Sequence, residues 1–327
     1  MITIYRSNGD ARILAPEALT DSVSIPDDVV WVDLLSPTHD EDALVERLLR
    51  IDVPTRDELK DIEPSSRLYT ENGTIYMTAS LVWKAESDQP ELTDVAFILT
   101  DRFLLTIRYA EPRSFELFKA AMSRIAGECR SGTAMIVRLM ETIVDRTAEI
   151  LETSVAKADT LSLEVFGDKR HLKRRPPHYL EDRLVAISAL HRLVAKTRDS
   201  LMSLSRLLTF LYAAPMLQTD RESRELCRTV SRDIQSLSEH ANFISSNISF
   251  LLDASLGLIN LEQNQIIKIF SIASVVLLPP TLIASIYGMN FEFMPELHAQ
   301  YAYPLSLGAM VVSAVIPFFF FRWKGWL

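Results

Sequence analysis

The sequence is poor in cysteine, with only Cys129 and Cys227 among 327 residues. Neither belongs to a CxxC pair or a His/Cys cluster, which argues against a structural zinc site or a disulfide framework and fits a reducing compartment. The N-terminal segment lacks the basic and apolar regions of a signal peptide, so we expect the bulk of the chain in the cytoplasm. GxxxxGK[ST], GxSxG and HExxH motifs are missing too, so we expect neither an enzyme nor a cofactor.

Positive charge is also scarce, because 34 Lys and Arg face 43 Asp and Glu, a formal net charge of −9. Phosphate binding is driven mainly by cations, so this balance argues against a nucleic-acid partner and suits a protein that attracts cations. The 35 residues between Arg232 and Lys268 contain no Lys or Arg. Within them Asp233 and Glu239 are interpreted as a solvated face. Asp253, stacked once per subunit around a common axis, would form a ring that concentrates divalent cations.

Long apolar runs are confined to the C-terminal end of the chain. The run from Ile266 to Tyr287 carries one charge, Lys268, and a second run from Tyr301 to Phe321 follows after 13 residues. A hydrocarbon core of about 30 Å needs roughly 20 apolar helical residues, so each run can span a bilayer. A helical hairpin in a soluble core is the alternative. Two such runs at the end of the chain favour a membrane hairpin over residues 264–327.

The first part of the chain alternates β-type runs with helical patterns. Residues rich in β-branched and aromatic side chains predict strands over 2–5, 29–34, 74–83, 95–99 and 103–108. Ser36-Pro37 is the predicted N-cap and first turn of a helix that ends near Leu49. Asp101-Arg102 is the predicted turn between the last two strands. We therefore predict a cytoplasmic α/β domain over residues 1–130.

Strand signals end at Thr133, after which the pattern predicts long helices over 133–166, 179–212 and 218–287. Residues 131–263 would form the cytoplasmic helices and stalk, and the basic run 169–175 a solvated loop between two helices. Apolar residues alternate at four- and three-residue steps from Val230 to Leu258. Because a lone rod with such a heptad seam would be unstable, the seam predicts a parallel bundle of subunits.

Small and polar residues gather on one side of the first apolar run. At alternating three- and four-residue steps it carries Asn264, Ile267, Ser271, Ser274, Leu278, Thr281 and Ser285. Helices in lipid also pack through Ser and Thr, so this stripe alone would favour helix packing over a pore. An amide that faces lipid is costly, and Asn264 and Asn290 at the two ends therefore favour a pore. Pro279-Pro280 predicts a kink that a pore helix tolerates.

The charges around the two apolar runs predict the orientation of the hairpin. The connecting loop 288–300 holds Glu292 and Glu296 but no Lys or Arg, whereas Arg322 and Lys324 follow the second run. By the positive-inside rule the loop lies outside, and both termini lie on the cytoplasmic side of an inner or plasma membrane. Glu292 and Glu296 would then attract arriving cations.

The segment YGMNFEFMPEL, Tyr287 to Leu297, resembles the signature of the CorA family of magnesium transporters, in which Gly-Met-Asn ends the first of two C-terminal spans. The similarity extends upstream to Glu262 and includes the tail RWKGWL. The resemblance implies an α+β membrane protein with a long helical stalk. It also implies a funnel-shaped homopentamer whose first spans line one axial pore.

Carried over residue by residue, the resemblance implies a selectivity filter of Gly288, Met289 and Asn290, with Asn290 facing hydrated Mg²⁺. It implies that Asn264, Ile267, Phe270, Leu278 and Thr281 face the pore, with a hydrophobic constriction at Ile267 and Phe270; Ser274 joins them from the stripe. It matches Asp253 to an acidic ring at the cytoplasmic end. The position of the regulatory carboxylate of some members falls on Thr229, so Asp233, one turn later, is the nearest candidate for a regulatory metal ligand.

These expectations predict uptake of Mg²⁺, and of Co²⁺ and Ni²⁺, down the electrochemical gradient, with Mg²⁺ as substrate and as the cytoplasmic ion that gates the pore. The expected partners are further copies of the chain, divalent cations and the bilayer, and no nucleic acid. A zinc or cobalt transporter of the same superfamily is one alternative, although such relatives usually have Gly-Ile-Asn at Gly288-Met289-Asn290. A membrane-anchored coiled-coil scaffold without a pore is the other.

Overall fold

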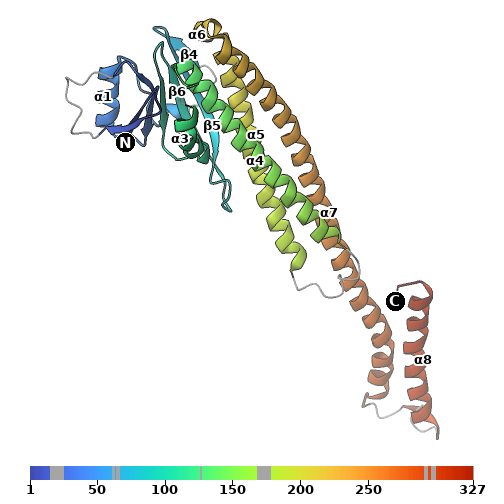
Figure 1. Ribbon diagram of the computed structural model, residues 1–327. Helices are drawn as coiled ribbons and strands as arrows, with labels where there is room; N and C mark the ends of the chain where they lie inside the picture. Colours follow the sequence, from blue (N-terminus) through green and yellow to red (C-terminus); the bar gives the residue numbers. More distant parts are fainter. Residues whose placement is uncertain are drawn as a thin grey trace. The chain divides into compact units, whose positions relative to one another are not determined.

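The computed structural model describes residues 1–14, 26–60, 63, 67–125, 127–167, 178–290, 294–295 and 300–326. These residues form two compact units, Met1–Leu252 and Asp253–Leu327 (Figure 1). The division of the sequence into three parts near residues 130 and 263 stays a prediction. The basic run 169–175, Glu292 and Glu296 lie outside the described residues.

The first unit is built on a seven-stranded mixed sheet with the order β2-β1-β3-β7-β6-β5-β4. Among these strands β3 and β7 are parallel, and the other neighbours pair antiparallel. The strands are β1 (Ile2–Arg6), β2 (Ala11–Leu14), β3 (Val29–Leu35), β4 (Leu68–Glu71), β5 (Thr74–Trp83), β6 (Glu91–Leu99) and β7 (Leu104–Arg108). The five predicted strands and the turn at Asp101-Arg102 are confirmed. The edge strands β2 and β4 were not predicted, because each has only four residues and none of them is buried.

Helices cover both faces of this sheet. Successive side chains of a strand point to opposite faces, and those of β3 are buried on both. Val32 and Leu34 point into a core that includes Val45 of α1 (His39–Leu49) and Leu59 of the 3₁₀ helix η2 (Glu58–Lys60). On the opposite face Trp31 packs edge-on against Phe118 of α3 (Arg113–Ile125), with ring centroids 5.5 Å apart. The domain is therefore a three-layer α/β/α arrangement.

The predicted start of α1 at Ser36-Pro37 is wrong by two residues. The N-cap is Thr38, whose hydroxyl accepts a hydrogen bond from the Glu41 N–H, while the Glu41 carboxylate accepts one from the Thr38 N–H. This capping box satisfies two backbone donors at once, which the serine cannot do because its backbone is left-handed (φ 44°). The helix therefore begins one residue after the threonine.

The long helices appear where the sequence predicts them, with one interruption. They are α4 (Gly132–Phe166), α5 (Tyr179–Ala213), the short α6 (Pro215–Thr219) and α7 (Arg221–Tyr287). The third predicted helix is broken at Asp220, whose carboxylate accepts hydrogen bonds from the N–H and the hydroxyl of Ser223. Asp220 thus starts a new helix, because a side-chain acceptor at this position caps the free N–H groups of the first turn.

The apolar seam of α7 has a different partner from the one predicted. Val230, Ile234, Ala241, Ile244, Ile248 and Leu251 are all buried within the single chain. In the first unit α7 runs beside α4 and α5 (Figure 1), and residues of α4 and α7 line a common pocket. The seam therefore packs this part of α7 onto its own chain and does not by itself require a second copy, so the bundle of subunits stays a prediction.

A charged cluster is buried between the sheet and α3. Arg108 of β7 donates two hydrogen bonds to Asp33 of β3, at 3.0 and 2.8 Å, and both side chains are at most 1% exposed. Thr106 donates a third at 2.8 Å, and the ammonium of Lys119 lies 3.2 Å from the same carboxylate. Burial raises the pKa of Asp33, but the hydrogen bonds and charge of Arg108, followed by the charge of Lys119, outweigh it and hold the pKa below 3.8.

Candidate ion pathway

Among the described residues, two helices are long and apolar enough to cross a membrane: α7, in its last third, and α8 (Ala302–Trp323). The second unit consists of the end of α7, the connection and α8 (Figure 1). Both prolines, Pro279 and Pro280, lie inside α7, which continues through them to Tyr287. α7 ends at Tyr287, as predicted for the first span, and α8 lies within two residues of the predicted second span, while the start of the first span inside α7 stays a prediction.

The two sides of the first span differ in what covers them. One side is buried or half-buried in the unit: Lys268, Ile272, Val276, Pro279 and Ile283 follow one another at steps of four and three residues, and Pro280 lies next to them. The predicted pore-lining residues occupy the other side and are all exposed: Asn264, Ile267, Phe270, Ser274, Leu278 and Thr281. The hairpin is thus packed without the polar stripe. Packing within one chain therefore does not account for the stripe.

Two hydroxyl groups of the stripe are bonded to their own helix. Ser274 donates to the carbonyl of Phe270 at 2.9 Å, and Thr281 donates to the carbonyl of Leu277 at 2.7 Å. Each proton is therefore used, and each oxygen keeps lone pairs that point away from the helix. Such a surface offers acceptors to water molecules, including those that surround a cation.

The first span ends at the predicted selectivity filter. The Gly288 N–H donates to the Ala284 carbonyl at 3.0 Å, and the Met289 N–H donates to the Ile286 carbonyl at 3.3 Å. A Cβ at Gly288 would lie 3.1 Å from the Ala284 oxygen, so the glycine allows this last helical turn to close tightly. Asn290 follows immediately and is exposed.

The predicted acidic sites lie on exposed parts of α7. Asp253 and Asp233 are both exposed. Burial, and then the negative charges of Glu141, Asp233 and Glu149, raise the pKa of Asp145 on α4, so Asp233 has a carboxylate neighbour in its own chain. Among the described residues no three His, Cys, Asp or Glu side chains form a group that could hold a metal ion. A regulatory site at Asp233 stays a prediction.

Cations and aromatic rings meet at one end of the hairpin. The Lys268 ammonium lies 5.4 Å from the ring centroid of Trp326, and Phe321 stacks on the same ring at 5.6 Å. The Lys324 ammonium lies 5.7 Å from the ring of Trp323. Amphipathic aromatic and basic side chains of this kind are typical of the water–membrane boundary.

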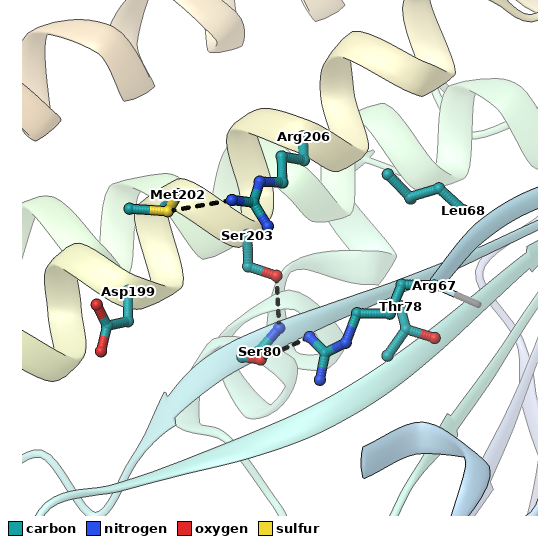
Figure 2. A pocket seen from close by; sticks show the side chains of 8 residues that line it. All are labelled: Arg67, Leu68, Thr78, Ser80, Asp199, Met202, Ser203 and Arg206. Carbon is teal, nitrogen blue, oxygen red and sulfur yellow. Dashed lines mark hydrogen bonds between the residues drawn. The ribbon is translucent and has the colours of Figure 1, made fainter. Parts of the chain in front are cut away.

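A pocket of about 230 Å³ lies between β5 and α5, away from the predicted pore residues in the sequence (Figure 2). Arg67 and Arg206 line it, and Arg67 is paired with Asp94 at 3.0 Å. The Ser203 hydroxyl accepts a hydrogen bond from the Ser80 N–H at 3.0 Å, which ties α5 to β5. Two guanidinium groups repel a divalent cation, so this pocket belongs to the contact between helix and sheet and not to the ion pathway.

Sequence reasoning missed two features that bear on the site. The first is the side of the first span that is buried or half-buried, from Lys268 to Ile283, because it becomes apparent only when the two helices of the hairpin are seen together. The second is the exposure of Phe243 and Phe250 on α7, at 61% and 69%. Their seven-residue spacing was visible in the sequence, but it was obscured by the stronger apolar seam beside it.

The comparisons with known proteins point to one family over nearly the whole chain. The model of the family described as CorA-like Mg2+ transporter protein matches residues 26–323. The magnesium transport protein CorA of Haemophilus influenzae is 34% identical over 328 residues, which cover 100% of both chains. The Campylobacter jejuni protein of the same name is 33% identical over 338 residues, again covering 100% of both.

Among solved structures, the complete CorA magnesium transporter from Methanocaldococcus jannaschii superposes with a TM-score of 0.74 at 20% identity, covering 100% of this chain and 98% of that one. The fold is therefore that of a membrane protein with an N-terminal α/β domain, a long helix and two C-terminal apolar helices. The family is one of transporters and not of enzymes. This chain belongs to the CorA-like Mg²⁺ transporter family.

Proposed function

We propose that this chain conducts Mg²⁺, and also Co²⁺ and Ni²⁺, across the membrane through an axial pore formed by five copies. The observation that carries the proposal is the exposed stripe of the first span, which lies opposite the side that packs the hairpin. A polar surface on a membrane helix is stable only against protein or water. Several first spans around one axis provide both.

The outer filter of the proposed pore is the ring of Asn290 amides next to Gly288 and Met289. Mg²⁺ loses its water reluctantly, so a site that strips the ion would hold it back. Amide oxygens can accept hydrogen bonds from the ion's own water and bind more weakly than a ring of carboxylates. Glu292 and Glu296 would raise the local cation concentration outside.

The inner half of the pore is proposed to contain the gate. Ile267 and Phe270 form a hydrophobic constriction. Asn264 lies on one side of it and Ser274, whose hydroxyl is bonded to its own helix, on the other. Leu278 and Thr281 continue the lining. At the cytoplasmic end Asp253 forms an acidic ring, and cytoplasmic Mg²⁺ near Asp233 holds the bundle closed. Loss of that ion would leave carboxylates to repel one another and loosen the helices.

The proposed orientation places the Gly-Met-Asn end outside and both termini in the cytoplasm. The meeting of Lys268 with Trp326, and the positions of Arg322 and Lys324, supply the positive charge that favours the cytoplasmic side. An inside-negative potential then contributes about 4.6 kcal/mol per 100 mV for a divalent ion, so uptake needs no other energy source.

Metal uptake into vesicles that contain the purified chain tests this function. We expect Mg²⁺ to enter, and the rate to rise with an inside-negative potential set by a potassium gradient. Vesicles without protein are the control. Zn²⁺ uptake that depends on a proton gradient, with no Mg²⁺ uptake, would favour the zinc transporter. No uptake of any metal by well-folded protein would favour the scaffold.

A further inference from the structure

The pocket between β5 and α5 offers many hydrogen-bond donors to whatever occupies it (Figure 2). Two guanidinium groups and three hydroxyl groups line it, those of Arg67, Arg206, Thr78, Ser80 and Ser203. Among the described residues the lining has one carboxylate, that of Asp199. We call this pocket the arginine pocket. Because guanidinium and hydroxyl groups donate to oxygen, and guanidinium is also positively charged, such a lining suits an oxyanion.

Arg206 of α5 supplies the main attraction for an anion. Among the described residues its guanidinium has no carboxylate partner. Its Nη2 donates a hydrogen bond to the sulfur of Met202 at 3.5 Å, and a thioether is a weak acceptor. A guanidinium has five N–H groups in a planar fork that matches the oxygens of a phosphate. Arg206 is exposed and therefore keeps donors that a ligand from solvent can reach.

Two hydroxyl groups can donate beside Arg206. The Ser203 oxygen accepts a hydrogen bond from the Ser80 N–H at 3.0 Å, which fixes the oxygen and leaves its own proton for another acceptor. Thr78 precedes Ser80 by two residues on β5, so both lie on the same face of the sheet. The Thr78 hydroxyl has no hydrogen-bond partner in the part of the chain that the structure describes. The pocket thus combines one charged donor with two neutral ones.

Arg67 forms a fixed wall of the pocket. Its Nη1 donates to the Ser80 hydroxyl at 3.1 Å, and its Nη2 donates to Asp94 at 3.0 Å. The Ser80 hydroxyl donates to the same carboxylate, so the three side chains hold one another in place. Asp94 offsets the charge of Arg67. The net attraction for an anion therefore comes from Arg206, and Arg67 keeps the pocket in shape.

The position of Asp199 and the size of the pocket restrict the ligand further. Asp199 precedes Arg206 by seven residues on α5, which is about 10 Å along the helix. This exceeds the screening length of about 8 Å at physiological ionic strength, so Asp199 repels an anion at Arg206 only weakly. The volume of about 230 Å³ is below the roughly 300–1,000 Å³ of pockets for drug-sized ligands. A small oxyanion fits these limits better than a nucleotide.

We propose that the arginine pocket binds a phosphate group, held by Arg206, Ser203 and Thr78. Free inorganic phosphate and the phosphate of a small monoester offer the same chemistry. The bound group would join α5 to β5 beside the Ser203–Ser80 hydrogen bond that already links them. The site uses none of the residues of the proposed pore, so the inference stands apart from the proposed function.

Titration calorimetry of inorganic phosphate into the full chain in detergent tests the site. The buffer contains no divalent cation, which would bind phosphate, and chloride keeps the ionic strength constant. We expect one phosphate per chain, and a higher unfolding temperature in phosphate than in chloride, because the ligand binds the folded state. Arg206→Gln should weaken binding roughly ten- to a hundredfold, because charge-assisted hydrogen bonds are lost.

Two further variants separate a specific site from general attraction to positive charge. Arg192→Gln removes another exposed arginine of α5, one that does not line the pocket, and should bind phosphate as wild type does. Thr78→Val keeps the shape of the side chain, removes only the hydroxyl, and should weaken binding by about two- to tenfold. Glycerol phosphate, titrated in the same way, distinguishes the sources: tighter binding than that of free phosphate supports a monoester, and weaker binding supports the free ion.

The proposal is overturned if wild type does not bind phosphate, or if Arg206→Gln or Thr78→Val binds it as tightly as wild type. Equal losses in Arg192→Gln and Arg206→Gln would indicate general attraction to a basic surface and would overturn it as well. The titration needs no transport, so its failure would leave the proposed pore untouched.

Discussion

Replacing Asn290 by alanine should abolish Mg²⁺ uptake by cells that depend on this chain. The amide is the group proposed to accept hydrogen bonds from the ion's water at the outer mouth, and alanine offers no acceptor there. Removing a single preorganised hydrogen-bonding group from a water-poor site typically costs 2.7–4 kcal/mol, or roughly a hundred- to a thousandfold in rate. A ring loses one such group per copy, so we expect no measurable uptake. Growth of a transport-deficient strain at low Mg²⁺ provides the measurement.

The Asn290 prediction needs a control that also removes an exposed amide from α7. Asn242→Ala is suitable, because Asn242 lies in the part of α7 that precedes the first span and is exposed. It should support growth as wild type does, at equal protein level in the membrane. Full uptake by Asn290→Ala would contradict the assignment of Asn290 to the filter. If cells without the chain took up Mg²⁺ equally well, a scaffold without a pore would be favoured.

Replacing Asp33 by alanine should strongly destabilise the α/β domain. The variant would leave the fully buried guanidinium of Arg108 without the carboxylate that accepts two of its hydrogen bonds, and only Glu111, 3.8 Å away and half-exposed, would remain near it. Breaking a buried ion pair by removing one member typically costs about 3–5 kcal/mol, because the remaining charge is uncompensated. A denaturant unfolding curve of the full chain in detergent measures the change. Glu91→Ala, which breaks the half-exposed Lys84–Glu91 pair, should change the midpoint little.

The same carboxylate should contribute to the acid sensitivity of the fold. Because the pKa of Asp33 is held below 3.8, its contribution to stability is complete above the pKa of an unfolded Asp, about 3.9, and is lost as the pH falls through the folded value. Asp33→Asn should therefore flatten the fall of stability in strong acid. A fall as steep as that of wild type would show that other carboxylates determine acid unfolding.

Much of the secondary structure could be predicted because local chemistry determines it. β5 (Thr74–Trp83) and α4 (Gly132–Phe166) agree with the predictions within one residue, since β-branched runs and helical periodicity are strong there. Prediction was wrong where two local signals compete. At the start of α1, Ser36 and Thr38 both suit an N-cap, and only the capping box with Glu41 decides between them.

The partner of a helix face is harder to predict than the face itself. The seam from Val230 was identified correctly as a contact surface, but a periodic pattern does not say whether its partner is the same chain or another copy. The burial of Val230, Ile234 and Ile244 within the single chain shows that the same chain covers this seam. The polar stripe raised the same question for the first span, and there the hairpin leaves the stripe open.

The most direct test of the central claim is the access of water to the stripe. Ser274 lies on the open side of the first span, and Ile272, two residues earlier, lies on the packed side and is 5% exposed. A cationic, membrane-impermeant thiol reagent reacts only with a cysteine that water reaches. The account predicts that it modifies Ser274→Cys and blocks Mg²⁺ uptake, while Ile272→Cys stays unmodified. An unreactive cysteine at 274 in a protein that still transports Mg²⁺ would contradict the claim.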